Sequence, residues 1–251
     1  MASLIALLTD FGDTDWYAGV LKGVIKNINK EVEIVDISHN APAWDIAGGA
    51  FMLECSYRYF PPRTVFCCIV DPGVGSDRLA LAATDGTYYF CGPDNGIFSA
   101  VMKESFRAYS ITEKKYMLSD VSNTFHGRDI FAPVSAYLAQ GIPPDRLGPA
   151  LASPVRLAEF VSRQGQTEGS IVYVDRYGNL ITNIPGDSLA GHRGIRIGAV
   201  QIEKIHASYS QADEGEVFAY PGSSGYIEIA VNRASAKEKL NTPPGTTVSL
   251  Y

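Results

Sequence analysis

The sequence predicts a layered α/β/α domain followed by a smaller all-β barrel domain. Strand and helix signals alternate up to about residue 148, which is typical of a sheet covered by helices on both faces. From residue 170 onward the signals are short strands separated by Gly, Asn and Asp, which favours a small barrel. A polar, Pro-containing stretch separates the two patterns. We therefore expect an α/β domain over residues 1–150, a linker over 151–169 and a β-barrel domain over 170–251.

Each element of the first domain follows from a local pattern. Apolar residues at helical spacing predict a helix from Trp16 to Ile28, with Thr14 or Asp15 available as its N-cap. The continuous apolar run from Thr64 to Val70 predicts a strand that is buried on both faces. The other expected elements are strands at Leu4–Leu8, Val32–Ile37, Leu79–Thr84 and Tyr88–Cys91, and helices at Asp45–Cys55, Ile97–Met102 and Ile130–Leu138.

The second domain is expected to consist of short strands. Turn residues interrupt its apolar segments every few positions, as in antiparallel barrels. The expected strands are Ser170–Val174, Leu180–Ile184, Ile195–Ile197, Val217–Tyr220, Tyr226–Ala230 and Thr246–Leu250.

Composition and charge argue against several classes of protein. The 251 residues are 46% hydrophobic, which is ample for packed cores, and the net charge is -6 at pH 7. Without a basic run, nucleic acid and anionic membrane surfaces are not expected partners. No apolar run reaches the roughly 18 residues of a membrane-spanning helix. The run Ala2–Leu8 lacks the basic start of a secretion signal, and the four cysteines show no CxxC spacing, so we expect a cytoplasmic protein.

Three polar clusters lie where ligands of α/β proteins usually bind. They are Asp10–Asp15 after the first strand, Asp71–Arg78 after the strand that ends at Val70, and Phe125–Asp129 before a helix. Because ligands bind beyond the carboxyl ends of the strands, we expect the clusters to converge on one site. Converging titratable groups are the usual mark of a functional site.

Simpler interpretations stay open for single residues. Asp13 and Asp15, taken singly, are typical of helix caps. Together with Asp10 they offer carboxylates suited to Mg²⁺ or Ca²⁺, so a metal-dependent hydrolase is one alternative, although the Gly and distal Glu of an EF-hand are missing. Structural roles are expected for three histidines outside the clusters, His39, His192 and His206.

Eight motifs resemble one known family. Those of the first domain are TDFGDTD (Thr9–Asp15), HNAPAWD (His39–Asp45), FPPRTVF (Phe60–Phe66), DPGVGSDR (Asp71–Arg78), GPDNG (Gly92–Gly96) and FHGRDIFAP (Phe125–Pro133). Those of the second are VDRYGNLITNI (Val174–Ile184) and GSSGYIEIAVN (Gly222–Asn232). In this order, over nearly the whole chain, they resemble the S-adenosyl-L-methionine (SAM) hydroxide adenosyltransferases, the hydrolytic relatives of fluorinase and chlorinase.

The resemblance implies a fold, an assembly and a reaction. The fold is an N-terminal α/β domain with a C-terminal β-barrel domain, and the assembly is a homotrimer. SAM would lie between the N-terminal domain of one subunit and the C-terminal domain of its neighbour. The reaction is that of SAM with water to give adenosine and L-methionine, and no cofactor takes part.

The same resemblance assigns a catalytic set and a nucleophile. The hydrolytic members share an Asp–Arg–His set, which falls on Asp71, Arg78 and His126. Fluorinase-like members carry a Tyr at the position of Asp71, a Thr near Val74, a halide-contacting Ser at the position of Gly127, and an insertion near residues 84–88 that is missing here. These differences favour water over halide.

Elementary chemistry fits this assignment. The leaving group is a neutral thioether expelled from a sulfonium, so the reaction needs no general acid, whereas water must be oriented and lose a proton. Asp71 or His126 can accept that proton, and Arg78 can hold Asp71 ionised. The sequence does not distinguish the two acceptors, and a purely structural Asp71–Arg78 ion pair is the simpler alternative.

The resemblance also places substrate-binding residues. Asp10 would bind the ribose diol, and Asp15 and Asp175 would lie near the methionine ammonium. Trp44, Phe125 and Tyr177 can stack on the substrate, although core packing explains Phe125 nearly as well. Asn179, unless it only forms the Gly178–Asn179 turn, would read the adenine edge together with Val231 and Asn232. The remaining expected contacts are Tyr17, Ser223 and Tyr226.

Two positions depart from the halogenating relatives. Ser224 stands where those relatives carry an Arg beside Ser223, and Tyr17 replaces a Ser, so the contact with the methionine carboxylate can differ. A non-catalytic module that binds adenosine or SAM is the second alternative to the hydrolase.

Overall fold

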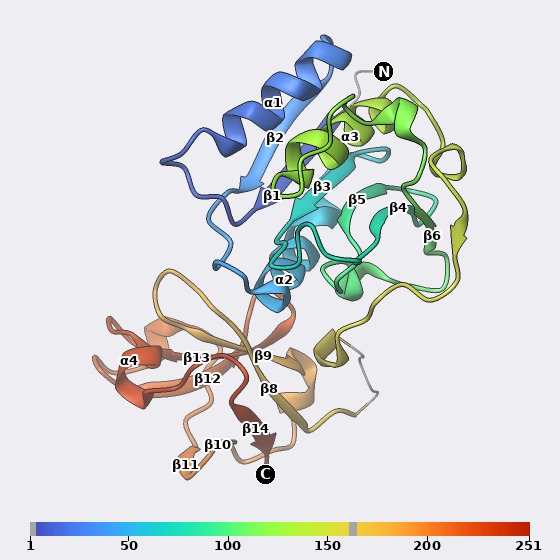
Figure 1. Ribbon diagram of the computed structural model, residues 1–251. Coiled ribbons are helices and arrows are strands. Elements are labelled where there is room, and N and C mark those ends of the chain that lie inside the picture. Colours follow the sequence, from blue (N-terminus) through green and yellow to red (C-terminus); the bar gives the residue numbers. More distant parts are fainter. Residues whose placement is uncertain (1–3, 161–164) are drawn as a thin grey trace. The chain divides into compact units, whose positions relative to one another are not determined.

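The computed structural model describes residues 4–160 and 165–251 (Figure 1). The chain forms two compact units, Met1–Leu157 and Ala158–Tyr251. The division at residue 157 falls inside the expected linker, of which residues 161–164 lie outside the described residues.

The N-terminal unit is built on a mixed seven-stranded sheet in the order β2-β1-β3-β5-β4-β6-β7. The first four strands in this order run parallel, and each later neighbour pairs antiparallel. The strands are β1 (Leu4–Thr9), β2 (Glu33–Ser38), β3 (Val65–Ile69), β4 (Ala80–Thr84), β5 (Tyr89–Pro93), β6 (Arg107–Ser110) and β7 (Ala150–Leu151).

Helices cover both faces of this sheet (Figure 1). Ile5 and Leu7 of β1 pack in one core with residues of α1 (Tyr17–Ile28) and α3 (Ala132–Ala139). Because side chains alternate along a strand, Ala6 and Leu8 face the opposite core, which Leu53 of α2 (Ile46–Ser56) enters. All five residues of β3 are buried, as expected for a strand between two helical layers. The predicted α/β/α layering is confirmed.

Two local predictions in this unit are wrong. Neither Thr14 nor Asp15 caps α1; the N-cap position belongs to Trp16, which is already in helical conformation and makes no side-chain cap. The segment Ile97–Met102 forms only one 3₁₀ turn, Ser99–Val101. There the Ser99 hydroxyl bonds to the Gly96 carbonyl and accepts the Leu157 N–H, so the segment binds to its neighbours instead of continuing as a helix.

The C-terminal unit is an antiparallel seven-stranded sheet in the order β11-β10-β14-β8-β9-β13-β12. Its strands are β8 (Glu168–Val174), β9 (Leu180–Pro185), β10 (Ile195–Ile197), β11 (Val200–Ile202), β12 (Val217–Pro221), β13 (Tyr226–Val231) and β14 (Thr247–Leu250). The chain after β11 pairs with β12, where the Ala219 N–H donates to the Lys204 carbonyl at 2.9 Å. This contact nearly closes the sheet around an Ile- and Leu-rich core, and the predicted all-β barrel is confirmed.

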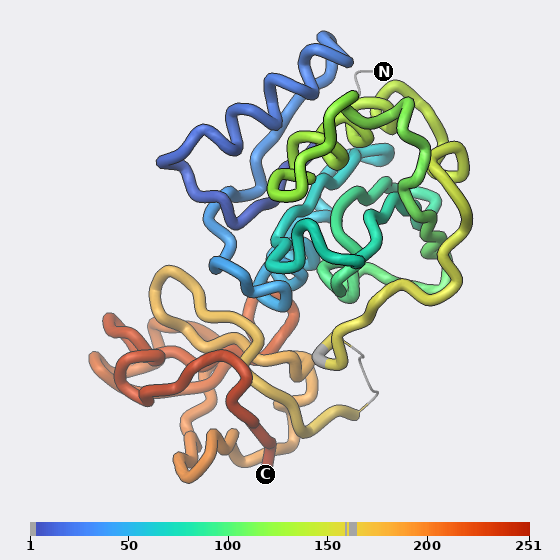
Figure 2. The backbone as a smooth tube through the Cα atoms, viewed as in Figure 1, coloured from blue at the N-terminus to red at the C-terminus, as the bar shows by residue number. Residues whose placement is uncertain are grey.

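Short elements that lack a clear pattern escaped the sequence analysis. They are the strands β6, β7 and β11 and the one-turn helix α4 (Ala236–Leu240), which Ser235 caps by accepting the Glu238 N–H. β6, β7 and β11 pair with neighbouring strands of the two sheets, and Figure 2 traces the course of the chain through both units.

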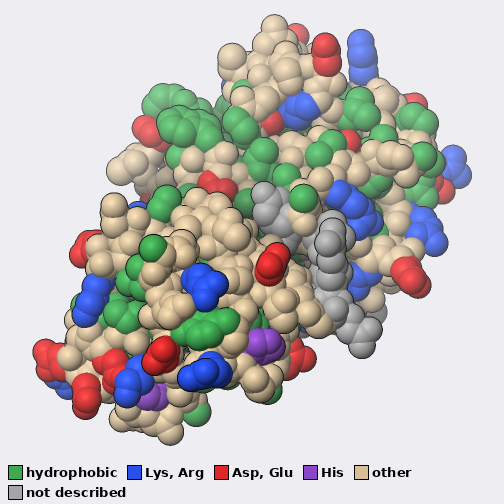
Figure 3. All heavy atoms as spheres, turned by 90° about the horizontal axis from the view of Figure 1, so that it is seen from below, with side chains coloured by type: hydrophobic (Ala, Val, Ile, Leu, Met, Phe, Trp, Pro, Cys, Tyr) green, Lys and Arg blue, Asp and Glu red, His purple; other side chains and the backbone are tan. Residues whose placement is uncertain are grey.

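Charged side chains of both signs lie on the surface. On the face drawn in Figure 3, acidic and basic side chains are interspersed. Among the described residues, no helix has both the length and the apolar character needed to cross a bilayer.

Candidate functional site

The N-terminal unit carries a pocket at the point where its strand order reverses. In the strand order, β2 lies next to β1 on one side, whereas β3, β5 and β4 follow on the other side of β1. Crevices at such switch points are the usual ligand sites of α/β sheets. Here the pocket measures about 260 Å³, and its walls include residues from all three polar clusters. They include Asp10, Phe11, Trp44, Asp71, Val74, Phe125, His126 and Gly127.

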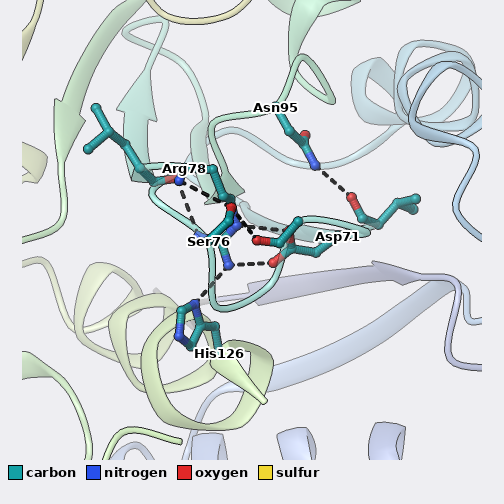
Figure 4. Close-up of polar contacts among 8 residues, drawn as sticks. Asp71, Ser76, Arg78, Asn95 and His126 are labelled. Carbon is teal, nitrogen blue, oxygen red and sulfur yellow. Dashed lines mark hydrogen bonds and ion pairs between the residues drawn. The ribbon is translucent and has the colours of Figure 1, made fainter. Parts of the chain in front are cut away.

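Asp71 and Arg78 form a bidentate ion pair. Arg78 Nε donates to Asp71 Oδ1 at 2.8 Å, and Nη2 donates to Oδ2 (Figure 4). Only 6% of the Asp71 side chain and 10% of the Arg78 side chain are exposed. Parallel bonds between a guanidinium and a carboxylate fix the orientation of both groups. Arg78 also lies over the Phe131 ring, with Cζ 5.3 Å from the centroid, which restrains the guanidinium plane.

His126 joins this pair through Arg78. Its Nδ1 lies 2.8 Å from Arg78 Nη2, although 48 residues separate the two in the chain. A guanidinium has donors and no acceptor, so Nδ1 must offer its lone pair. The neutral ring therefore carries its proton on Nε2. The structure thus brings Asp71, Arg78 and His126 into one hydrogen-bonded set.

Electrostatics favour the neutral form of His126. Burial lowers the pKa of His126 below its ordinary value, the nearby Arg78 guanidinium lowers it further, and Asp71 and Asp129 act in the opposite direction. Burial raises the pKa of Asp10, and the negative charge of Asp71 adds to this effect, while the Trp44 N–H opposes it. The pocket therefore holds two carboxylates whose charges disfavour each other.

The loop after β3 holds Asp71 and Arg78 in place. Within it, the Ser76 hydroxyl donates to the Gly73 carbonyl at 2.7 Å, and Asn95 from the end of β5 donates to the Val70 carbonyl at 2.8 Å (Figure 4). Gly75 has a φ of +79°, and a Cβ there would lie 2.3 Å from the Asn123 carbonyl oxygen. A glycine is required here because the loop passes against the segment that leads to His126.

Asp10 and the aromatic residues form the other wall. Asp10 Oδ2 accepts a hydrogen bond from the backbone N–H of Trp44 at 3.0 Å. The Trp44 residue itself is 76% exposed. Phe11, Tyr17 and Phe125 pack together, and the centroids of the Tyr17 and Phe125 rings are 5.1 Å apart. Large exposed aromatic rings beside a titratable pocket are suited to stacking on a flat ligand.

Three sequence-predicted residues of this unit lie outside the pocket lining. Arg78 lies behind it and contacts two lining residues, Asp71 and His126. Asp15 is on the exposed bend before α1, and Tyr17 packs against two lining residues, Phe11 and Phe125. Asp13 hydrogen-bonds to Asn40. Among the described residues, no three His, Cys, Asp or Glu side chains gather in a way that would hold a metal ion, so Asp10, Asp13 and Asp15 do not form the ligand set of the metal-hydrolase alternative.

The C-terminal unit has a second, larger pocket of about 740 Å³. Five sequence-predicted residues line it, namely Asp175, Tyr177, Asn179, Ser223 and Val231. Tyr226 and Asn232 do not line it. The amide of Asn232 instead donates to the Ala212 carbonyl at 2.7 Å.

Asp175 and Asn179 form a tight turn at the edge of this pocket. Asp175 Oδ1 accepts the N–H groups of Tyr177 and Asn179 at 2.9 and 2.8 Å. Its Oδ2 accepts the Asn179 side-chain amide at 2.8 Å. The turn expected for Asn179 is therefore present, and it places the residue at the pocket wall.

The sequence analysis missed several residues of both sites. Tyr209, Tyr220, Glu228 and Arg233 line the second pocket; Glu228 lies in the quoted motif GSSGYIEIAVN, which was the available signal. In the N-terminal unit the missed lining residues are Ala43, Ile69 and Thr124. His39 has a structural role, as expected. Its ring lies between Thr9 Oγ1, at 2.8 Å, and Asp36, at 3.1 Å, and its carbonyl accepts the Gly12 N–H. These contacts fix the loop that carries Asp10.

Comparisons with known proteins agree with this architecture. The N-terminal domain of the SAM hydroxide adenosyltransferase family matches residues 5–148, and the C-terminal domain of that family matches residues 169–249. A protein of Thermus thermophilus named (R)-S-adenosyl-L-methionine hydrolase is 33% identical over 98% of this chain and 98% of its own. A fluorinase of Actinopolyspora mzabensis is 27% identical over 98% of this chain and 96% of its own. An uncharacterized conserved protein from Thermotoga maritima has a TM-score of 0.91 and 35% identity, over 98% of this chain and 100% of that one.

Fold and site together define a two-domain protein, an α/β unit with a titratable cleft followed by a β-barrel. Both parts of this chain match one family in order and almost completely. The chain belongs to the SAM hydroxide adenosyltransferase family, and the resemblance stated from the motifs is confirmed.

The close approach at Gly75 predicts a position-specific loss of stability. Gly75→Ala should lower the free energy of unfolding by about 1–3 kcal/mol more than Gly86→Ala, because its Cβ must displace the Asn123 carbonyl. Gly86 is a matched control, since its φ is +91° and nothing lies within 4 Å of the added Cβ. Urea unfolding followed by circular dichroism measures both. Equal losses for the two variants would show that the contact with Asn123 does not constrain the loop.

The lowered pKa of His126 predicts how stability depends on pH. Since the folded pKa lies below the ordinary value of about 6.5, the unfolded chain binds more protons between these two values. The contribution of His126 is therefore fully present above pH 6.5 and is lost as pH falls toward the folded pKa. Urea unfolding between about pH 5 and 8 should show a steeper acid loss for the natural protein than for His126→Asn. Parallel curves would contradict this.

Proposed function

We propose that this protein hydrolyses SAM to adenosine and L-methionine. The observation that carries the proposal is the hydrogen-bonded set of Asp71, Arg78 and His126, of which Asp71 and His126 line the switch-point pocket. Membership of the SAM hydroxide adenosyltransferase family supports it, as do full-length relatives that carry the name (R)-S-adenosyl-L-methionine hydrolase.

The proposed chemistry is a direct displacement at the 5′ carbon. A water oxygen forms a bond to C5′ while the C5′–S bond breaks, and the bonding electron pair leaves with sulfur as the neutral thioether of L-methionine. The water proton passes to a protein base, and adenosine keeps the new hydroxyl group. Since the thioether leaves without protonation, the protein supplies alignment, charge and one proton acceptor. This balance requires no cofactor.

The geometry favours Asp71 as that acceptor. The one lone pair of neutral His126 faces Arg78, so the ring can accept a proton only after this bond breaks. A carboxylate has about four lone-pair positions, and Arg78 uses two of those on Asp71. Asp71 therefore retains lone pairs for a water molecule. The Arg78 guanidinium, which is bonded to Asp71, can stabilise negative charge that develops on the water oxygen.

Other residues of the N-terminal pocket are suited to the nucleoside. The Asp10 carboxylate can accept two hydrogen bonds from the ribose diol. The exposed ring of Trp44 can stack on a flat base or contact the sulfonium. Phe125, which packs against Phe11, can do the same. Asp15 and Tyr17 are proposed to contact the methionine end.

The second pocket is proposed to bind the rest of the substrate. Asn179 and the main chain at Val231 would read the adenine edge, with Asn232 beside them, while Tyr177, 78% exposed, supplies a further stacking face. Asp175, Ser223 and Tyr226 are proposed to contact the methionine end. A homotrimer, with the N-terminal domain of one subunit and the C-terminal domain of its neighbour contributing to each site, is part of the proposal. So is a cytoplasmic location, which the four free cysteines support.

Incubation with SAM and product separation by liquid chromatography test the proposal. Equal amounts of adenosine and methionine should form, and ¹⁸O-labelled water should deliver its oxygen to the 5′ hydroxyl. Asp71→Asn should lower kcat about 10²- to 10⁴-fold, because amide nitrogen and oxygen cannot accept the proton. Asp77→Asn is the matched control, since Asp77 is an exposed acid of the same loop. Saturable SAM binding without turnover would instead indicate the non-catalytic module, and label outside the 5′ position would refute direct displacement.

A further inference from the structure

Glu228 is a buried carboxylate that faces the pocket of the C-terminal unit. It lies in β13, and 7% of the residue is exposed. Its Oε2 accepts the Tyr220 hydroxyl, and its Oε1 accepts the Ser224 hydroxyl at 3.1 Å. Both donors are neutral. In the described part of the chain, no Lys, Arg or His forms an ion pair with Glu228.

A buried carboxylate without a cation is costly in a folded protein. Removal of the charge from water is offset only when another charge or a full set of hydrogen bonds replaces the water. Two hydroxyl donors fill about half of the lone-pair positions on Glu228. The remaining positions are available at the wall of a 740 Å³ pocket, so a cationic ligand group is the partner that would complete them.

The other charged residues of the pocket do not supply that partner. Arg233, which also lines the pocket, directs its Nη1 to Glu214 at 3.2 Å, and the two side chains are 75% and 74% exposed. Asp175 adds a second carboxylate, which already accepts three hydrogen bonds from its own turn. The inner part of the pocket is therefore negative, and Glu228 is its less occupied carboxylate.

Neighbouring hydroxyls fix Glu228 in this position. Tyr209 and Tyr220 hydroxyls are 3.1 Å apart, which extends the chain of hydrogen bonds away from the carboxylate. Burial raises the pKa of Tyr220, and its bond to Glu228 raises it further, so this hydroxyl remains a donor. A Cβ on Gly222 would lie 2.1 Å from Glu228 Oε1, so the turn between β12 and β13 also encloses the group.

We propose that Glu228 binds the α-ammonium group of the methionine moiety of SAM and thereby selects substrates that carry a free amino group. This inference rests on the proposed function, which brings a substrate with two cationic centres, the sulfonium and the ammonium. The sulfonium has no N–H to donate, whereas the ammonium has three donors for the unused lone pairs of Glu228. Glu228 is thus a specificity-determining residue and takes no part in the proton transfer at C5′.

Two ligands and two variants test this assignment. SAM is compared with its deaminated analogue, in which hydrogen replaces the α-amino group, on the natural protein and on Glu228→Gln. Glu228→Gln should raise KM for SAM about 10- to 100-fold, the usual strength of a hydrogen bond to a charged group, and leave kcat within about threefold. For the analogue the two proteins should differ less than about threefold in KM. Glu203→Gln, an exposed acid of the same unit, is the matched control and should change neither.

Equal losses for both ligands would overturn the assignment, because Glu228 would then contact a part common to both, such as the adenine amino group. Unchanged KM for SAM would also overturn it. If Glu228→Gln does not fold, Glu228→Asp retracts the carboxylate by one methylene and supports the same comparison. If the natural protein binds SAM but does not hydrolyse it, the proposed function fails, while calorimetric Kd values for the two ligands still test Glu228. A natural protein that binds neither ligand would contradict both proposals.

Discussion

The N-terminal site depends on a single guanidinium. Arg78 donates two hydrogen bonds to Asp71 and one to His126, and these residues come from two loops that are far apart in the chain. Burial lowers the pKa of His126, and the charge of Arg78 lowers it further. A lysine would supply the charge but not the planar fork that reaches both partners at once.

The surrounding loops are fixed by contacts that carry no chemistry themselves. Gly75 lets the loop after β3 pass against Asn123, and Asn95 ties the start of this loop to the end of β5. On the other side, His39 contacts Thr9 and accepts the Gly12 N–H, so it holds both ends of the segment that carries Asp10. His39 and Gly75 therefore both act on loop geometry, His39 on the segment that carries Asp10 and Gly75 on the loop that carries Asp71.

The two pockets divide different physical tasks. The N-terminal pocket is small and dominated by one ion pair, which is suited to orienting a water molecule. The C-terminal pocket is nearly three times as large, and hydroxyls, a turn and two carboxylates line it, which is suited to recognising an extended polar ligand. Each pocket belongs to its own compact unit.

The sequence by itself determined the layers, most of the strands and the motifs that carry Asp71, Arg78 and His126, because periodicity and turn residues are local signals. It did not determine the α1 cap, the single turn at Ser99–Val101, or the short strands β6, β7 and β11, where local preference is weak and neighbours decide. Only the tertiary structure showed that the lone pair of His126 faces Arg78, and that Glu228 lies buried without a cation. Such facts depend on which side chains meet across the fold, and no spacing along the chain encodes the direction in which a ring nitrogen or a carboxylate points.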